Sequence, residues 1–166
     1  MMHPVHALQP GDALLYYTGD DLSAPRWGRL FAKLVYLKTW RRVSHVAVYI
    51  GGGRTVEARA EGVGIYEVKW DNLVAHLRPD GPIDITAAMA WFNSEASGQR
   101  YDFLGLFRFF TLGKQSTDKQ FCSELATRWY RAGGFEPFTS DVDADLTCPG
   151  DFLYTPKFRN LPLVSK

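Results

Sequence analysis

Three strand-like segments follow one another in the middle of the chain, and this run constrains the fold more than any other feature. Ser44–Ile50 is rich in branched and aromatic residues and leads into Gly51–Gly53, which favours a tight turn. Arg54–Ala60 can pair back onto it, and the alternating pattern of Val63–Trp70 predicts a third strand after the Glu61–Gly62 turn. The sequence therefore predicts an antiparallel meander.

Helical patterns lie on both sides of the meander. Apolar residues at three- and four-residue intervals predict an amphipathic helix over residues 26–43. An alanine-rich stretch predicts a second helix over 83–97, with Asp84 or Thr86 as its cap and Gly98 at its end. A third helix is expected over 121–132, before Gly133–Gly134.

The remaining segments predict two further strands and an extended end. Ala13–Tyr17 is a short apolar run after a turn at Pro10–Asp12, which indicates a strand. Phe152–Tyr154 is interpreted as a strand that returns to the sheet, and Pro156–Lys166 as an extended, mobile tail. The expected class is α+β.

The bulk composition describes a single folded domain with no strong charge. The chain has 166 residues, near the usual size of one domain, and its 46% hydrophobic and 14% aromatic residues are typical of globular proteins. The net charge is +1, so no global field draws it to nucleic acid, and no nucleic-acid partner is expected.

The prediction for localisation is cytoplasmic, with peripheral membrane contact left open. Residues 1–10 lack the pattern of a secretory signal, and no run of about 18 apolar residues is present. The basic residues of the 26–43 helix can meet anionic lipid head groups or remain solvated.

Cys122 stands where the third helix is expected to begin. Unpaired N–H groups and the helix dipole at such a position stabilise a thiolate, which is the nucleophilic form of cysteine. The alternative is a buried cysteine that fills a gap in the core. A disulfide with Cys148 is not expected in a reducing compartment, and the spacing of the cysteines and histidines is not that of a metal site. No cofactor is expected.

His45 begins an apolar strand, where its ring can reach the end of the sheet that faces the third helix and accept the thiol proton. It can equally cap the strand or bond a backbone carbonyl. Because the chain also contains His3, His6 and His76, composition does not choose among the histidines.

Five segments together resemble a known family, the circularly permuted branch of the NlpC-like papain-fold superfamily. This branch includes the YiiX-like cysteine hydrolases and is related to lecithin:retinol acyltransferase. In it the histidine strand precedes the cysteine helix, as His45 precedes Cys122 here. The matching segments are Pro10–Tyr16, Ser44–Gly51, Val56–Ala58, Tyr101–Gly105 and Phe121–Leu125.

The resemblance implies a fold and a set of site residues. It implies one permuted papain-like domain over residues 1–166, with its core at about 11–155, in which an antiparallel sheet packs against helices and the nucleophile lies at a helix N-terminus. Cys122 would be the nucleophile and His45 its base. Glu57, on the strand after the histidine, would orient the imidazole, and Tyr101 would line the pocket and donate to an oxyanion.

Two of these roles have plain alternatives. Glu57 alternates with Arg59 and Glu61, so it can belong to a row of solvated charges on one strand face. Tyr101 begins an aromatic stretch that can be ordinary core.

The expected function is that of a cysteine-dependent hydrolase or acyltransferase acting on an amide or ester through an acyl-thioester enzyme. The expected substrate is a small-molecule amide, a peptide or a lipid, and the sequence does not predict an oligomeric state. The alternative is a catalytically inactive binding module that retains the papain-like fold.

Overall fold

The computed structural model describes residues 2–4, 6–20, 26–101, 119–120 and 122–165. Within these residues, six strands form one sheet in the order β5-β4-β3-β2-β6-β9, and every neighbouring pair is antiparallel. The strands are β2 (Ala13–Tyr16), β3 (His45–Gly51), β4 (Arg54–Arg59), β5 (Gly62–Glu67), β6 (Leu73–Pro79) and β9 (Phe158–Leu161). The class is therefore mixed α+β.

The predicted meander is present as β3, β4 and β5. Val48 of β3 pairs with Val56 of β4, and Val56 pairs in turn with Ile65 of β5. Gly51, Gly52 and Gly53 all have positive φ angles, so the turn between β3 and β4 uses the conformational freedom that glycine provides. The predicted strand at 13–17 is also confirmed, and it lies inside the sheet between β3 and β6.

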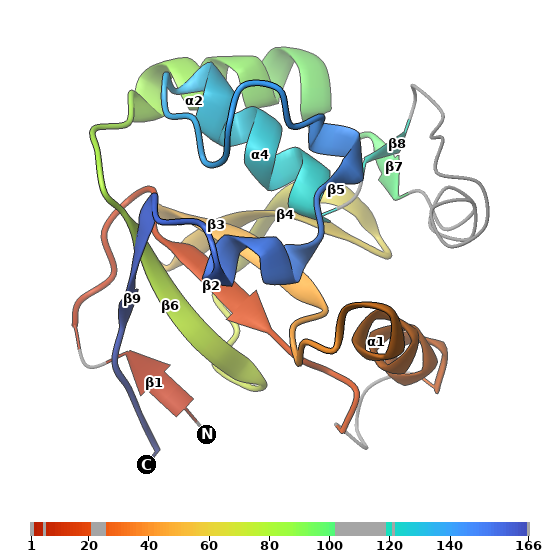
Figure 1. Cartoon of the computed structure of the whole chain (residues 1–166). Coiled ribbons are helices and arrows are strands. Elements are labelled where there is room, and N and C mark those ends of the chain that lie inside the picture. The colour runs from red at the N-terminus through yellow and green to blue at the C-terminus, as the bar shows by residue number, and fades with distance from the viewer. Residues whose placement is uncertain (1, 5, 21–25, 102–118, 121, 166) are drawn as a thin grey trace.

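Two helices cover one face of this sheet (Figure 1). They are α2 (Ile85–Trp91), which continues into a π-helical turn, η1 (Phe92–Ala96), and α4 (Cys122–Ala132). Asp84 caps α2 by accepting a hydrogen bond from the backbone N–H of Ala87 at 2.9 Å, so Asp84 rather than Thr86 is the cap. Gly98 follows η1 with a φ of 82°, as a helix end requires.

A third helix, α1 (Arg26–Thr39), lies beside the sheet rather than on the face that α2 and α4 cover (Figure 1). It ends earlier than the predicted residue 43 because Trp40 has a φ of 56°, outside the helical region. None of the described helices is long and apolar enough to cross a membrane.

An aromatic cluster fixes α4 on the sheet. Trp129 and Tyr130 of α4 are fully buried, and the Tyr130 ring lies 5.3–6.2 Å from the rings of Phe135, Phe152 and Phe158. Each buried aromatic side chain stabilises the fold by about 1.5–3 kcal/mol. The Tyr130 hydroxyl also donates to the Gly11 carbonyl at 2.8 Å, which ties the helix to the start of β2.

The C-terminal predictions were wrong in two respects. Phe152–Tyr154 does not form a strand, because the 3-10 helix η3 (Pro149–Leu153) occupies this part of the chain. Pro149 starts this helix, and the Asp151 side chain stabilises its first turn by accepting a hydrogen bond from the Cys148 N–H at 2.8 Å. The tail is extended, as predicted, but it is paired into sheets up to Ser165. Phe158 is buried and anchors β9 beside β6, and β10 (Leu163–Ser165) pairs with β1 (Met2–Pro4).

A buried charged cluster joins β2 to β6. The Asp12 carboxylate lies 2.7 Å from Nε2 of His76 and accepts two hydrogen bonds from Arg78, at 2.8 and 2.9 Å. Burial raises the pKa of Asp12, but the hydrogen bonds from Arg78 and His76 outweigh this effect and hold it below its usual value. Because Asp12 also accepts from the Gln9 N–H at 2.9 Å, the cluster closes the turn that precedes β2.

Candidate active site

Cys122 is the first residue of α4, and the helix start is held firmly in place. The hydroxyl of the next residue, Ser123, is buried and donates to the Thr147 carbonyl at 2.6 Å. The Thr127 hydroxyl donates back to the Ser123 carbonyl at 2.8 Å. Because the Ser123 hydroxyl already donates this hydrogen bond, Ser123 stabilises the start of the helix. Cys122 itself is buried, with an exposed fraction of 4%.

His45 is the first residue of β3, and the neighbouring strand fixes it. The N–H of Ser44 donates to the Tyr16 carbonyl at 2.8 Å, and the ring of Tyr16 lies 5.9 Å from the His45 ring. The side chain of His45 retains 21% of its accessible surface, so it is the partly open member of the site.

Cys122 lies close enough to His45 to shift the pKa of the imidazole, so the structure brings these two predicted residues together. Burial lowers the pKa of His45, but the charge and hydrogen bond of Cys122 and those of Glu57 outweigh it and raise the value to about 10. An imidazole with this pKa carries its proton at neutral pH. The imidazole therefore lies between the Cys122 side chain and the Glu57 carboxylate.

Glu57 holds the other side of the imidazole. Its Oε2 lies 2.8 Å from Nε2 of His45, and its side chain is only 2% exposed. Because Nε2 is engaged by Glu57, Nδ1 is the ring nitrogen left for the thiol. Burial raises the pKa of Glu57, but the His45 and Arg59 hydrogen bonds and charges lower it to about 2. The alternative of a solvated charge is therefore wrong for Glu57.

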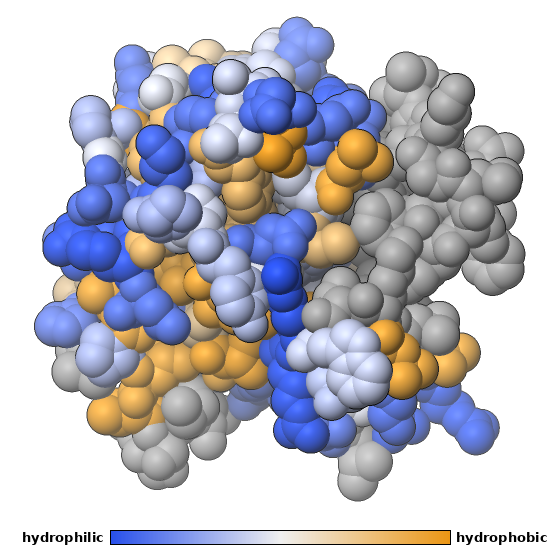
Figure 2. All heavy atoms as spheres, viewed as in Figure 1, coloured by the Kyte–Doolittle hydropathy of each residue, from blue (hydrophilic) through white to orange (hydrophobic). Residues whose placement is uncertain are grey.

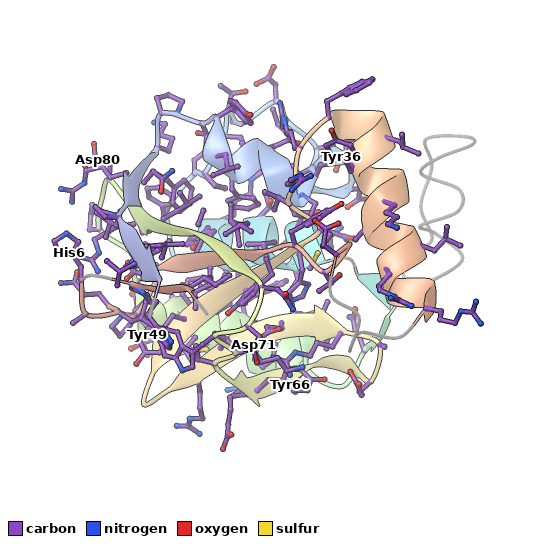
Figure 3. All side chains as sticks on the ribbon, turned by 90° about the horizontal axis from the view of Figure 1, so that it is seen from below. His6, Tyr36, Tyr49, Tyr66, Asp71 and Asp80 are labelled. Atoms are coloured by element: carbon purple, nitrogen blue, oxygen red, sulfur yellow. The ribbon has the colours of Figure 1, made fainter. Side chains whose placement is uncertain are left out.

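Two residues that hold Glu57 were not predicted as part of the site. The Thr55 hydroxyl donates to Oε1 at 2.5 Å, and Arg59 donates to both carboxylate oxygens at 2.7 Å. The Arg59 guanidinium also lies 4.2 Å from the centre of the Tyr66 ring on β5, which Figure 3 labels at the lower edge of the sheet. The signal was in the sequence, because residues 55, 57 and 59 share one strand face.

The predicted role of Tyr101 falls on a side chain outside the described residues. Its backbone lies in β7 (Arg100–Tyr101), which pairs in parallel with β8 (Lys119–Gln120). Tyr101 aligns with Gln120, two positions before Cys122. The strand pair thus places the backbone of Tyr101 beside the approach to α4, and its role stays a prediction.

Two further observations concern disulfides and metal ions in the described part of the chain. Neither Cys122 nor Cys148 is in a disulfide, and Cys148 is half-buried near the start of η3. No group of three or more His, Cys, Asp and Glu side chains among the described residues is arranged to hold a metal ion. The chemical content of the site is thus a thiol, an imidazole and a carboxylate in series.

Three separate elements supply these groups: α4 carries Cys122, β3 carries His45 and β4 carries Glu57. In a series of thiol, imidazole and carboxylate, the thiolate can attack an electrophilic carbon, the imidazolium can return a proton to a leaving group, and the carboxylate keeps the ring oriented.

No protein-family model and no curated protein matches the chain.

Proposed function

We propose that the protein is a cysteine-dependent hydrolase or acyltransferase that acts on an amide or ester, with Cys122 as nucleophile and His45 as acid and base. One observation carries the proposal: the His45 ring is held between the Cys122 thiol and a buried carboxylate, Glu57. A histidine that only capped its strand would not need a carboxylate buried to 2% exposure and fixed by three donors.

The reaction follows from the positions of the proton and the sulfur. The Cys122 thiolate attacks the substrate carbonyl carbon, and the carbonyl oxygen becomes an oxyanion. His45 gives its proton to the leaving nitrogen or oxygen as that bond breaks, which leaves an acyl group on the sulfur as a thioester. His45 then takes a proton from water or from an acceptor alcohol or amine, which attacks the thioester and restores the thiolate.

The oxyanion requires donors that point at it. The N–H of Cys122 lies at the N-terminus of α4, where backbone N–H groups have no partner within the helix, so it is suited to this role. Tyr101 is the second donor in this proposal, since its backbone lies in the strand pair that leads to α4. Loss of one such donor slows comparable enzymes by about 10²- to 10³-fold.

The proposed architecture is a permuted papain-like domain. It is supported by the order of the elements, since the strand that starts with His45 precedes the helix that starts with Cys122. It is also supported by the antiparallel sheet, one face of which is covered by that helix and by α2.

A binding module without turnover is the second candidate, and the burial of Cys122 favours it. At 4% exposure, the sulfur can be reached by a substrate carbonyl only if the neighbouring groups yield. A module of this kind would keep the three side chains in place and never form a thioester.

A hydrolysis assay separates the two candidates. Wild type, Cys122→Ala, His45→Ala and Cys148→Ala are each incubated with a panel of N-acyl amino acids, short peptides and fatty acyl esters, and the released amine or alcohol is measured. The enzyme proposal predicts turnover of at least one class by wild type and Cys148→Ala, and loss by about 10⁴-fold or more in the other two variants. Turnover that survives in Cys122→Ala would refute the proposal.

A further inference from the structure

Helix α1 exposes a stripe of large apolar side chains. Leu30 and Leu37 are 60% and 61% exposed, and Trp40, just beyond the helix end, is 77% exposed. Their spacing of seven and three residues places them along one side of the helix. Ala32, which lies on the opposite side, is fully buried, so the helix packs through that side and turns the stripe outward.

The same stripe is basic. Residues 26–42 contain six Lys and Arg residues and no Asp or Glu, although the whole chain has a net charge of only +1. Arg26 lies four residues before Leu30, and Lys33 lies three residues after it. Both side chains are exposed, and neither makes an ion pair within the described residues. Arg41 and Arg42, farther along, pair with Asp151 and Asp20.

The pictures show how accessible this helix is. In Figure 2, apolar and charged side chains lie side by side over the part of the surface where Figure 1 places α1. Figure 3, seen from below, shows α1 at one side of the molecule, with nitrogen-tipped side chains directed away from the sheet. Tyr36 is labelled on this helix, and its ring lies 6.1 Å from that of Trp40.

We propose that this stripe, formed by Arg26, Leu30, Lys33, Leu37 and Trp40, docks the protein on an anionic lipid surface. Leucine and tryptophan side chains partition into the boundary between head groups and acyl chains, while the amphipathic Lys and Arg side chains reach the phosphates. The complete lack of acidic residues between 26 and 42 makes the charge of this helix complementary to anionic head groups.

Docking through α1 would bring the candidate site close to the lipid. Only residues 40–44 separate the end of α1 from His45, and Arg41 anchors this connection through an ion pair with Asp151 and a contact at 4.1 Å with the Tyr154 ring. This step rests on the proposed function: the acyl substrate would then be a lipid at the membrane surface rather than a soluble amide.

The test is sedimentation of the full chain with vesicles of phosphatidylcholine alone or mixed with phosphatidylglycerol. Wild type should bind only the anionic vesicles, and added salt should release it. Arg26→Gln/Lys33→Gln should lower the partition coefficient about 25-fold, at about fivefold for each charge, and Leu37→Ser should weaken binding as well. Matched controls are Arg54→Gln/Lys157→Gln and Leu146→Ser, which change exposed residues elsewhere and should bind like wild type.

Three results would overturn the docking proposal. The first is that wild type binds neither kind of vesicle. The second is that the control variants lose as much vesicle binding as the stripe variants. The third is stripe-dependent retention on a heparin column without vesicle binding, which would assign the stripe to a polyanionic macromolecule.

Cys122→Ala should bind vesicles like wild type. If it does and no substrate is turned over, only the proposed function fails; if soluble substrates are turned over and vesicles are not bound, only the docking fails.

Discussion

Nε2 of His45 lies 2.8 Å from Oε2 of Glu57, a carboxylate that is almost completely buried. Because Thr55 and Arg59 hold the same carboxylate, it cannot turn away from the ring. The imidazole is thereby fixed in orientation, and its other nitrogen is left for Cys122.

Replacing Glu57 by Gln should slow catalysis strongly and leave the fold in place. The amide has nearly the same shape, but it does not stabilise a protonated His45, so kcat should fall by about 10²-fold or more. The measurement is kcat with whichever substrate class wild type accepts. Glu61→Gln is the matched control, since Glu61 is an exposed glutamate of the same hairpin and should be silent. Equal kcat in Glu57→Gln and wild type would remove Glu57 from the mechanism.

The His45 imidazole should titrate with a pKa of about 10, which can be followed by NMR of the ring. In Cys122→Ala the pKa should be lower, because the charge and hydrogen bond of Cys122 are lost while burial still disfavours the cation. Cys148→Ala should leave the titration unchanged. An unshifted His45 pKa in Cys122→Ala would show that the two side chains do not interact.

Acid should destabilise the protein partly through Glu57. Its pKa is depressed from 4.5 to about 2 in the folded state, so the stabilisation is complete above pH 4.5 and is lost as the pH falls through 2. A shift of this size corresponds to at most about 3 kcal/mol. Urea unfolding from pH 5 to pH 2 should therefore show a steeper loss of unfolding free energy in wild type than in Glu57→Gln. Parallel curves would contradict the burial and pairing of this carboxylate.

Asp12 should matter for stability rather than for the chemistry. Asp12→Asn removes the charge that pairs with Arg78 and His76 inside the fold and should cost about 2–4 kcal/mol of unfolding free energy. Asp80→Asn, which changes an exposed ion pair with Arg159, should cost less than about 1 kcal/mol. Equal unfolding free energies of the two variants in urea would disprove the structural role of the Asp12 cluster.

Much of the central fold could be predicted because local patterns determine it. The glycines of residues 51–53 and the branched residues around them identified the meander, and Asp84 and Gly98 marked the limits of the second helix. The partners of Cys122 could be named only through the family resemblance, since the pattern around His45 is also that of an ordinary strand start. No match to a family model or curated protein tests that resemblance.

The parts that escaped prediction depend on contacts between distant segments. β6 was not predicted. It contains the buried His76, whose partner is the Asp12 carboxylate in the turn before β2, about sixty residues earlier in the chain. The tail looked mobile, but Phe158 inserts among the aromatic rings around Tyr130 and carries β9 into the sheet. The sequence places Arg59 on the same strand face as Glu57, but the fold was needed to show that the Arg59 guanidinium binds the Glu57 carboxylate.

The central claim, that Cys122 forms a thioester with help from His45, is tested most directly by trapping the acyl-enzyme. Wild type, Cys122→Ala, His45→Ala and Cys148→Ala are mixed with an activated acyl ester and quenched in acid, and the adduct is located by intact-mass and peptide mass spectrometry. The account predicts one acyl group on Cys122 in wild type and Cys148→Ala, none on residue 122 in Cys122→Ala, and a much slower reaction in His45→Ala. An adduct on Cys148 alone, or none on the folded wild type, would contradict it.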